Sequence, residues 1–425
     1  MAKIIVIGGG AAGMMAAIQA AEAGAQVEIW ERNKVLGKKL AITGKGRCNL
    51  TNACSPEEVI KNMPGNGMFL YSALFAFSPE DTMDFFANLG VQLKVERGRR
   101  VFPASDDAKQ IVSALQKRLQ ELGVKIIYGR RVRNLKIEDK RLVGIFSDDG
   151  LTPAACAIVA TGGKSYAATG SSGDGYLWAK EAGHSIRHLR PSLVPLETME
   201  DWPSRLSGLS LKNVRVTATT VTGEKESIIG QEFGEMLFTH FGLSGPVILT
   251  LSHGICAHLP GQEVKIYINL KPALSREQLE ARMQRDLDKF SRKHLQNSLG
   301  DLLPASLIGV IVQLSGIDPH KECNQINKKE RETLVDILQS LPLTVKGPRP
   351  IEEAIITAGG VNVKEIDPKT MQSKLVEGLY FAGEVLDIDG LTGGYNLQAA
   401  FATGAAAGKA AADLVLSREN CRKND

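Results

Sequence analysis

A glycine-rich turn near the start of the chain has the spacing of a phosphate-binding loop. Residues 8–13 read Gly-Gly-Gly-Ala-Ala-Gly, a G-x-G-x-x-G pattern directly after the apolar run 4–7. In this pattern Gly8 permits a tight turn, Gly10 lets the backbone approach a pyrophosphate, and Gly13 lets a helix pack on the strand. The N-terminus of that helix offers N–H groups and positive partial charge to the phosphates. The pattern predicts dinucleotide binding, and a chance glycine-rich turn is the alternative.

An acidic residue follows at the place where the ribose of a dinucleotide would lie. Glu31 ends the apolar run 27–30 and stands 18 residues after Gly13. Its carboxylate can accept a hydrogen bond from a ribose 2′-hydroxyl and would repel a 2′-phosphate. Strand, turn, helix and acid together favour FAD or NAD as the ligand, rather than NADP or a chance turn.

The far end of the chain distinguishes FAD from NAD. An apolar run ends in Gly383 and Glu384, where a carboxylate can hold a ribityl chain. Gly393 and Gly394 remove side chains where the edge of an isoalloxazine ring can lie. A helix expected from about Leu397 would direct its N–H groups at the flavin N1/C2=O locus, which becomes negative on reduction. FAD is therefore the predicted cofactor, and an ordinary glycine-rich loop before a helix is the alternative.

The patterns around these turns predict an α/β fold. Continuous apolar runs at 4–7 and 27–30 are typical of parallel strands covered on both faces. From about residue 193 the apolar residues alternate, as in antiparallel strands, and from Ser275 helical spacing returns behind a capping box. We therefore expect a dinucleotide-binding domain made from both chain ends and interrupted by an insertion. The predicted divisions are 1–190 and 348–425 for this domain, 191–272 for an inserted β domain and 273–347 for a helical insertion.

Individual elements are predicted by the same signals. Ser105 is expected to cap a helix over 106–122, and Asn327 with Glu330 repeats the capping-box pattern of Ser275. Further helices are expected over 11–23, 55–62, 79–89 and 397–416, and further strands over 124–128, 132–137, 142–147, 155–160 and 379–382.

Composition limits the class of protein and its partners. The 425 residues carry a formal net charge of +4, with Lys and Arg in short scattered groups rather than the long block of a nucleic-acid-binding arm. Six cysteines without CxxC spacing indicate reduced thiols, and no metal site is predicted. No cleavable signal precedes the first strand, and the apolar stretches are too short or too interrupted to span a bilayer. We expect a soluble cytoplasmic protein that acts on a small anionic molecule, with no nucleic-acid or membrane partner.

Longer motifs resemble one family of flavoproteins. Residues 37–52, GKKLAITGKGRCNLTN, are similar to the signature of the BaiN/YhiN-type, aminoacetone-oxidase-like, FAD-dependent oxidoreductases. The resemblance runs from residue 1 to about 415, and Lys45 is a minor departure. It implies a glutathione-reductase-type FAD-binding Rossmann-like domain, an inserted antiparallel barrel-like domain and a small helical domain. Further similar blocks stand at 98–105, 160–166, 234–246, 357–361 and 383–398.

The resemblance also implies a set of FAD contacts. Lys39 and Arg47 offer positive charge to the pyrophosphate, although a solvated basic loop is the alternative. Val132 can pair its backbone with adenine. The implied cofactor-binding residues are Gly8, Gly10, Ala11, Ala12, Gly13, Glu31, Arg32, Lys39, Leu40, Thr43, Gly44, Arg47, Cys48, Asn49, Val132, Thr161, Gly162, Gly383, Glu384, Gly393, Gly394, Tyr395, Asn396 and Leu397.

Two residues are candidates for catalysis. His240, in a glycine-rich turn of the insertion, can donate or accept a proton, and Arg100 can bind a substrate carboxylate. The alternatives are a hydrogen-bonded turn histidine and a solvated arginine. Cys48 has no partner at disulfide-exchange spacing, so we expect it to pack in the interior. Many flavin reactions need no protein nucleophile, because the cofactor itself accepts the hydride.

The chain has one G-x-G-x-x-G, so a separate NAD(P)H-binding domain is not expected. NADH or NADPH would dock transiently, or the electrons would come from the organic substrate. We expect an oxidoreductase that exchanges a hydride between flavin and a small organic molecule lying between the flavin and the insertion. Amine oxidation and NAD(P)H-dependent reduction of a conjugated C=C both stay open. The alternatives are a flavin-dependent RNA-modifying enzyme, which would need a broad basic face, and a non-catalytic flavin-binding redox protein.

Overall fold

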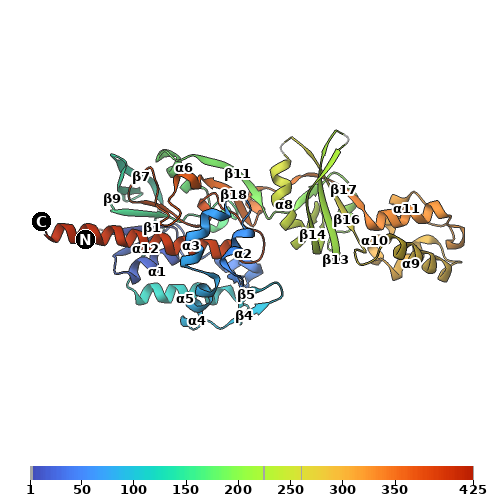
Figure 1. The fold of residues 1–425 in the computed structure, drawn as a ribbon, viewed down its shortest axis with the longest axis horizontal. Helices are drawn as coiled ribbons and strands as arrows, with labels where there is room; N and C mark the ends of the chain where they lie inside the picture. The colour runs from blue at the N-terminus through green and yellow to red at the C-terminus, as the bar shows by residue number, and fades with distance from the viewer. Residues whose placement is uncertain (1–2, 224, 260, 425) are drawn as a thin grey trace. The chain divides into compact units, whose positions relative to one another are not determined.

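The computed structural model describes residues 3–223, 225–259 and 261–424 and divides into two compact units (Figure 1). The first unit combines Met1–Arg190 with Ile351–Asp425, so it contains both ends of the chain. The second unit is the continuous segment Pro191–Pro350. The side chain of Cys421, one of the six cysteines, lies outside the described residues.

A five-stranded parallel sheet forms the centre of the first unit, in the order β19-β10-β1-β2-β6. The central strand β1 is fully apolar and buried, as a strand covered on both faces must be. Its last residue, Ile7, pairs with Trp30 on one side and Val159 on the other, and Val159 pairs with Phe381. The carboxyl ends of four strands are therefore level, which is where α/β sheets bind ligands. The strands are β1 Ile4–Ile7, β2 Val27–Glu31, β6 Lys125–Tyr128, β10 Cys156–Val159 and β19 Leu379–Phe381.

The first and last helices of the chain pack directly on each other (Figure 1). A Cβ atom on Gly404 or Gly408 would lie 2.4 Å from the carbonyl oxygen of Ala12 or 2.1 Å from that of Ala16, respectively. Only glycine permits this approach of the two backbones. The packed helices are α1 Ala11–Glu22, α5 Ala108–Glu121 and α12 Tyr395–Asn424, with α1 in contact with both others.

Helix α12 is long and apolar enough, by length and composition, to cross a membrane over Tyr395–Glu419. It is the one such helix in the described part of the chain, and 61 % of its apolar stretch is buried inside the structure. Contacts with α1, with α3 and with strands β3 and β10 account for this burial.

Small sheets and short helices complete the first unit. Strand β5 pairs with both β3 and β4, β8 pairs with β7 and β9, and β11 pairs with β18. The strands are β3 Thr51–Asn52, β4 Leu93–Glu96, β5 Arg100–Pro103, β7 Val132–Glu138, β8 Arg141–Ser147, β9 Gly150–Pro153, β11 Ile186–Ser192 and β18 Ile356–Val361. The helices are α2 Pro56–Lys61, α3 Tyr71–Ala76, α4 Pro79–Asn88 and α6 Asp174–Glu181.

The predicted cap of helix α5 is wrong. The helix begins at Ala108, and Asp107 caps it by accepting a hydrogen bond from the Lys109 N–H at 2.9 Å. Asp106 has a φ of 55°, in the left-handed region, so the helix cannot start before it. Ser105 instead donates to the side chain of Gln110. Ser and Asp are both good N-caps, so composition alone did not separate them.

The second unit contains a closed barrel in the order β12-β15-β14-β13-β16-β17. Every neighbouring pair is antiparallel, and β16 buries Val264, Ile266 and Ile268 in strict alternation. The strands are β12 Leu196–Thr198, β13 Ser210–Thr222, β14 Lys225–Thr239, β15 Gly242–Ser244, β16 Glu263–Asn269 and β17 Leu341–Pro348. The helices are α7 Trp202–Arg205, α8 Pro246–His258, α9 Arg276–Lys289, α10 Ala305–Ser315 and α11 Lys328–Gln339. Both predicted capping boxes are present, at α9 and at α11.

Two elements of the second unit differ from the pattern expected of the sequence. Helix α8 lies inside the stretch expected to be antiparallel β, and it packs on β14. Its buried residues include Val247, Leu251 and Ile255, spaced four apart, which is a helical period. Strand β17 lies inside the stretch expected to be helical, and its buried residues alternate. Helices α9 to α11 therefore stand between two neighbouring barrel strands.

Candidate functional site

The glycine turn after β1 contacts loops from two other parts of the first unit. A Cβ atom on Gly8 would lie 2.6 Å from the carbonyl oxygen of Ala160, at the end of β10. A Cβ atom on Gly383, which follows β19, would lie 2.8 Å from the Cβ of Ala12. The turn is thus enclosed by the loops after β10 and β19, and the two ends of the chain meet at it.

Within this turn, one glycine is free of contact with the protein. A Cβ atom on Gly13 would lie 1.9 Å from the Gly8 carbonyl oxygen, whereas a Cβ atom on Gly10 would meet no atom within 4 Å. Gly10 is the N-cap of α1, and no side chain caps the helix. The first N–H groups of a helix have no partner within it. Open space beside uncapped N–H groups fits the pyrophosphate of a dinucleotide.

The carboxylate of Glu31 is held firmly at the end of β2. It is buried, and it accepts hydrogen bonds from the Gly9 N–H at 2.8 Å, the Asn33 N–H at 2.7 Å and the Asn33 side chain at 2.8 Å. A carboxylate can accept about four hydrogen bonds, so one place is left for a ribose hydroxyl. Sequence reasoning did not include Asn33, which orients this acid.

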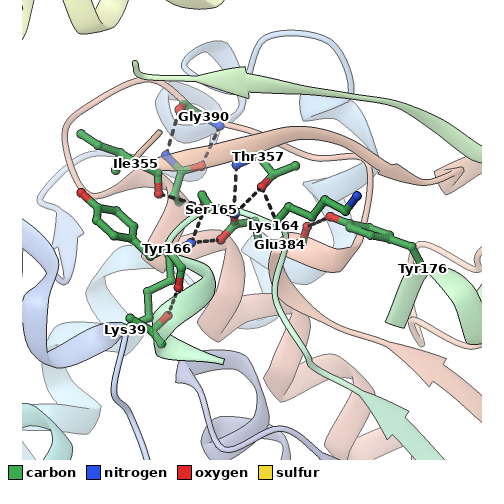
Figure 2. A network of polar contacts seen from close by, with 11 residues as sticks. Lys39, Lys164, Ser165, Tyr166, Tyr176, Ile355, Thr357, Glu384 and Gly390 are labelled. Carbon is green, nitrogen blue, oxygen red and sulfur yellow. Dashed lines mark hydrogen bonds and ion pairs between the residues drawn. The ribbon is translucent and has the colours of Figure 1, made fainter. Parts of the chain in front are cut away.

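A second polar network joins four segments of the first unit (Figure 2). The Lys39 Nζ lies 2.6 Å from the Glu384 carboxylate and 2.8 Å from the Ser165 hydroxyl. Glu384 also accepts hydrogen bonds from the Thr357 N–H at 2.8 Å and the Ser165 hydroxyl at 2.9 Å. The network brings together Lys39 and Glu384, both predicted FAD contacts. It adds Ser165 and Thr357, whose only signal in the sequence was their place in two family-like blocks.

Three polar atoms near these turns have no hydrogen-bond partner. Among the residues that the structure describes, five buried side-chain polar atoms are unsatisfied, and three of them are Asn49 Oδ1, Asn52 Oδ1 and Thr161 Oγ1. Leaving such an atom without a partner costs about 1–3 kcal/mol. Asn49 and Thr161 are predicted FAD contacts, whereas Asn52 was missed. Unsatisfied acceptors and hydroxyls at these positions fit the polar groups of FAD.

The C-terminal glycine turn packs closely against the chain itself. Gly394 has a φ of 99°, and a Cβ atom on it would lie 2.4 Å from the Thr51 carbonyl oxygen. Helix α12 begins at Tyr395, two residues before the predicted start. The Asn396 side chain accepts from the Gly390 N–H and donates to the Gly390 carbonyl, both at 2.8 Å. The turn therefore presents the N-terminus of a 30-residue helix in a fixed loop.

Two predicted basic contacts are already neutralised by acids. Arg47 donates to Asp106 at 2.7 Å and to Glu96, and its guanidinium lies 4.2 Å from the centre of the Phe102 ring. Arg32 donates to Asp174 at 3.2 Å and to a serine hydroxyl. Binding of either side chain to a phosphate would require it to leave its carboxylate, so both contacts stay predictions.

The other predicted contacts all lie on the first unit. Cys48 is buried, and burial raises the pKa of its thiol to about 12, so it is not a nucleophile at neutral pH. The remaining contacts are Leu40, Thr43 and Gly44 in the 3₁₀ segment Leu40–Gly46, Val132 at the start of β7, Gly162 after β10 and Leu397 in the first turn of α12.

The two candidate catalytic residues lie in different units. Arg100 begins β5 of the first unit and is exposed. His240 is exposed in the turn between β14 and β15 of the second unit, with its ring centre 4.9 Å from that of Phe241. Their roles in catalysis stay predictions.

A family model described as the HI0933-like protein Rossmann domain matches residues 2–410. The chain belongs to the HI0933-like family. This membership confirms the predicted resemblance and, with the uncapped turn and the two-ended fold, the FAD cofactor. The HI0933-like chain is an FAD-dependent oxidoreductase with a Rossmann-like domain.

The HI0933-like chain is similar over its whole length to proteins of known activity. It is 35 % identical over 416 residues to the 3-dehydro-bile acid delta(4,6)-reductase of Clostridium scindens, covering 97 % of this chain and 100 % of the relative. It is 32 % identical over 405 residues to the ribosomal RNA dihydrouridine synthase of Haemophilus influenzae, covering 94 % and 96 %. A solved 3-ketosteroid delta1-dehydrogenase from Sterolibacterium denitrificans shares the fold, with a TM-score of 0.52, 12 % identity, and coverage of 97 % and 100 %.

Proposed function

We propose that the chain reduces a C=C bond conjugated to a carbonyl group in a small organic substrate. NADH or NADPH supplies the electrons, and the reaction takes place in the cytoplasm. The observation that carries this proposal is the start of α12 at Tyr395, directly after Gly393 and Gly394. A helix N-terminus there would stabilise the negative charge that the flavin gains on reduction, which favours the half-reaction in which NADH or NADPH passes a hydride to the cofactor.

The names of two relatives support the same class of reaction. One is called a delta(4,6)-reductase of 3-dehydro-bile acids, and the other a dihydrouridine synthase. Dihydrouridine is uridine in which the C=C bond conjugated to a ring carbonyl has been reduced. Both names thus describe the addition of two hydrogens to an electron-poor double bond. The bile-acid reductase has the higher identity and acts on a small molecule, so it is the preferred guide to the substrate.

In this proposal the side chains of the chain bind and orient, and FAD supplies the hydride. The N–H groups at the start of α1 would hold the pyrophosphate, and Glu31 would hold the ribose. The Lys39–Glu384 ion pair would position the ribityl chain, and Asn52 would offer its unpartnered Oδ1 to the ring. His240 is the proposed proton donor to the substrate, because an imidazole ring can both donate and accept a proton.

A second candidate is the reduction of uracil within RNA. The 32 % identity to a ribosomal RNA dihydrouridine synthase extends over 94 % of this chain, which favours it. The two candidates share the reaction and differ in the substrate, so a comparison of substrates decides between them.

The deciding experiment follows the visible flavin band of the purified protein without oxygen. We expect NADH or NADPH to bleach the band, and a 3-oxo-4,6-diene bile acid to restore it while gaining hydrogen. Restoration by unmodified ribosomal RNA, and not by the bile acid, would select the second candidate. Bleaching by aminoacetone with peroxide formed in air would contradict both and support amine oxidation. A protein without a flavin band would contradict the cofactor assignment.

A further inference from the structure

The β4–β5 hairpin carries one arginine that is fully paired. Arg99 donates to the Glu58 carboxylate through both terminal nitrogens, at 2.7 and 2.5 Å. Arg47, which packs on the same hairpin through Phe102, is held by two further carboxylates. The hairpin therefore already shows bidentate binding of a carboxylate by a guanidinium group.

Two other arginines of the hairpin lack such partners. Arg97 and Arg100 are exposed, and neither forms an ion pair with an acid in the part of the chain that the structure describes. The Arg100 Nε donates to the Arg97 carbonyl oxygen at 3.1 Å, and its guanidinium lies 5.8 Å from the centre of the Phe102 ring. This bond orients the guanidinium and leaves the four N–H groups of its terminal nitrogens for a ligand.

One amide connects these arginines to the C-terminal glycine turn. The Asn52 Nδ2 donates to the Gly98 carbonyl at 3.0 Å and to the Gly393 carbonyl at 3.1 Å. Asn52 also lies opposite Arg100 in the pairing of β3 with β5. Arg100 therefore lies opposite Asn52, which bonds directly to the turn at the predicted flavin edge, and Arg97 precedes Gly98, which is linked to that turn through Asn52. The unsatisfied Asn52 Oδ1, which the proposed function assigns to the flavin ring, lies on the same residue and so places the two arginines near that ring.

We propose that Arg97 and Arg100 bind the carboxylate of the substrate, so that the enzyme selects small organic acids that carry a conjugated C=C. This inference rests on the proposed function and adds the charge of the substrate to it. Two like charges without acid partners repel each other, and an oxyanion removes that repulsion. The planar fork of arginine matches the two oxygens of a carboxylate, as the Arg99–Glu58 pair does within the protein.

The test compares a charged and an uncharged form of one probe. A 3-oxo-4,6-diene bile acid and its methyl ester are titrated into the oxidised holoenzyme by calorimetry. We expect the wild type to bind the acid about tenfold to a hundredfold more tightly than the ester, as charge-assisted hydrogen bonds provide. In the double variant R97Q/R100Q this preference should vanish, while the affinity for the ester changes by less than about twofold. R141Q/R276Q, which removes one exposed arginine from β8 and one from α9, is the charge-matched control and should keep the preference.

Each outcome supports or overturns the inference. Equal binding of acid and ester by the wild type, no binding of either, or an unchanged preference in R97Q/R100Q would overturn it. So would a loss of ribosomal RNA binding in the variant with acid binding intact, because the anion would then be a phosphodiester. A preference that depends on these arginines, without turnover by NADH or NADPH, would leave the inference standing and refute the proposed function. FAD content and melting temperature equal to those of the wild type show that the variant is folded.

Discussion

The two glycine-rich turns of the first unit look alike in sequence but use glycine differently. In the N-terminal turn, Gly8 and Gly13 are required by the backbone, whereas Gly10 faces open space. In the C-terminal turn, Gly394 abuts the Thr51 carbonyl, and Gly393 abuts the ring of Tyr395. Gly10 of the N-terminal turn thus leaves space for a ligand, whereas Gly393 and Gly394 of the C-terminal turn allow the chain to pack closely against itself. The role of each glycine in such a motif therefore depends on which atoms a Cβ atom at its position would contact.

The largest effect that tests this comparison is expected for Gly10→Val. Gly10 has a φ of −82°, which any residue adopts, and nothing lies within 4 Å of its Cβ position. The valine should therefore leave the stability of the apoprotein within about 1 kcal/mol of the wild type. It should weaken FAD binding by more than about a hundredfold, because the side chain fills the place of the pyrophosphate. FAD content by absorbance and urea unfolding of the apoprotein measure the two effects.

Gly13→Ala is the control for this variant. Its Cβ atom would lie 1.9 Å from the Gly8 carbonyl, so the apoprotein itself should be destabilised. Wild-type FAD content in a folded Gly10→Val protein would refute the assignment of the open space to the cofactor.

An intermediate effect is expected for Gly394→Ala. Its φ of 99° strains a residue with a side chain, and the new Cβ atom would meet a backbone carbonyl at 2.4 Å. We expect the free energy of unfolding of the apoprotein to fall by about 2–4 kcal/mol, measured in urea. Gly393→Ala is the matched variant, since Gly393 also has a positive φ, of 135°. It should cost less, because the nearest atoms belong to the ring of Tyr395, which can rotate away. Equal losses in the two variants would contradict this account.

The sheet and the first turn were predictable because their signals are local. Strand β1 coincides with the apolar run 4–7, and α12 starts two residues from its expected position. Capping boxes at Ser275 and Asn327 were predicted because a cap is decided within four residues. The family match and the observed sheet confirm the predicted fold class. It could be predicted for the same reason, since its strands, turns and helices each carry their own local pattern.

Partners distant in sequence were not predictable. Thr357 accepts a hydrogen bond from Ser165 across 192 residues, and no local pattern specifies that pairing. The same applies to Asn52, whose amide joins Gly98 to Gly393. The predicted element type is wrong for helix α8 and strand β17, because each is a short apolar run that lies in a stretch dominated by elements of the other type. The division of the insertion into a β and a helical part, and the individual FAD contacts, stay predictions.

The smallest expected effect concerns His184, which hydrogen-bonds to two residues of the C-terminal part of the first unit. His184 is buried, with Nδ1 3.1 Å from Glu365 and Nε2 2.8 Å from Ser373. Burial lowers the pKa of His184 below its usual 6.5, and Glu365 only partly opposes this. Below about pH 6.5 the unfolded chain binds a proton at His184 more readily than the folded chain does. The contribution of this residue to the free energy of unfolding is therefore complete above about pH 6.5 and decreases as the pH falls.

The slope of the unfolding free energy between about pH 7 and 5 should reach at most about 1.4 kcal/mol per pH unit for this group. In His184→Asn that contribution should disappear, as urea unfolding at several pH values would show. The lowered pKa of Glu365 acts in the same direction but below about pH 4.5, and the raised pKa values of Glu232 and Asp387 act in the opposite direction in both proteins. The difference in slope between the wild type and the variant therefore isolates the histidine. An identical slope in the variant would contradict the assignment.

The close packing of Gly404 and Gly408 on α1 has a consequence for how the protein is made. Helix α1 is translated long before its partner surface on α12, because the two helices stand far apart in the sequence. The continuous segment Pro191–Pro350 can acquire its structure while synthesis continues, whereas the domain that flanks it cannot form its α1–α12 contact until α12 has been translated. During that interval the apolar surface of α1 that packs on α12 is uncovered, and such surface on a nascent chain is prone to aggregation.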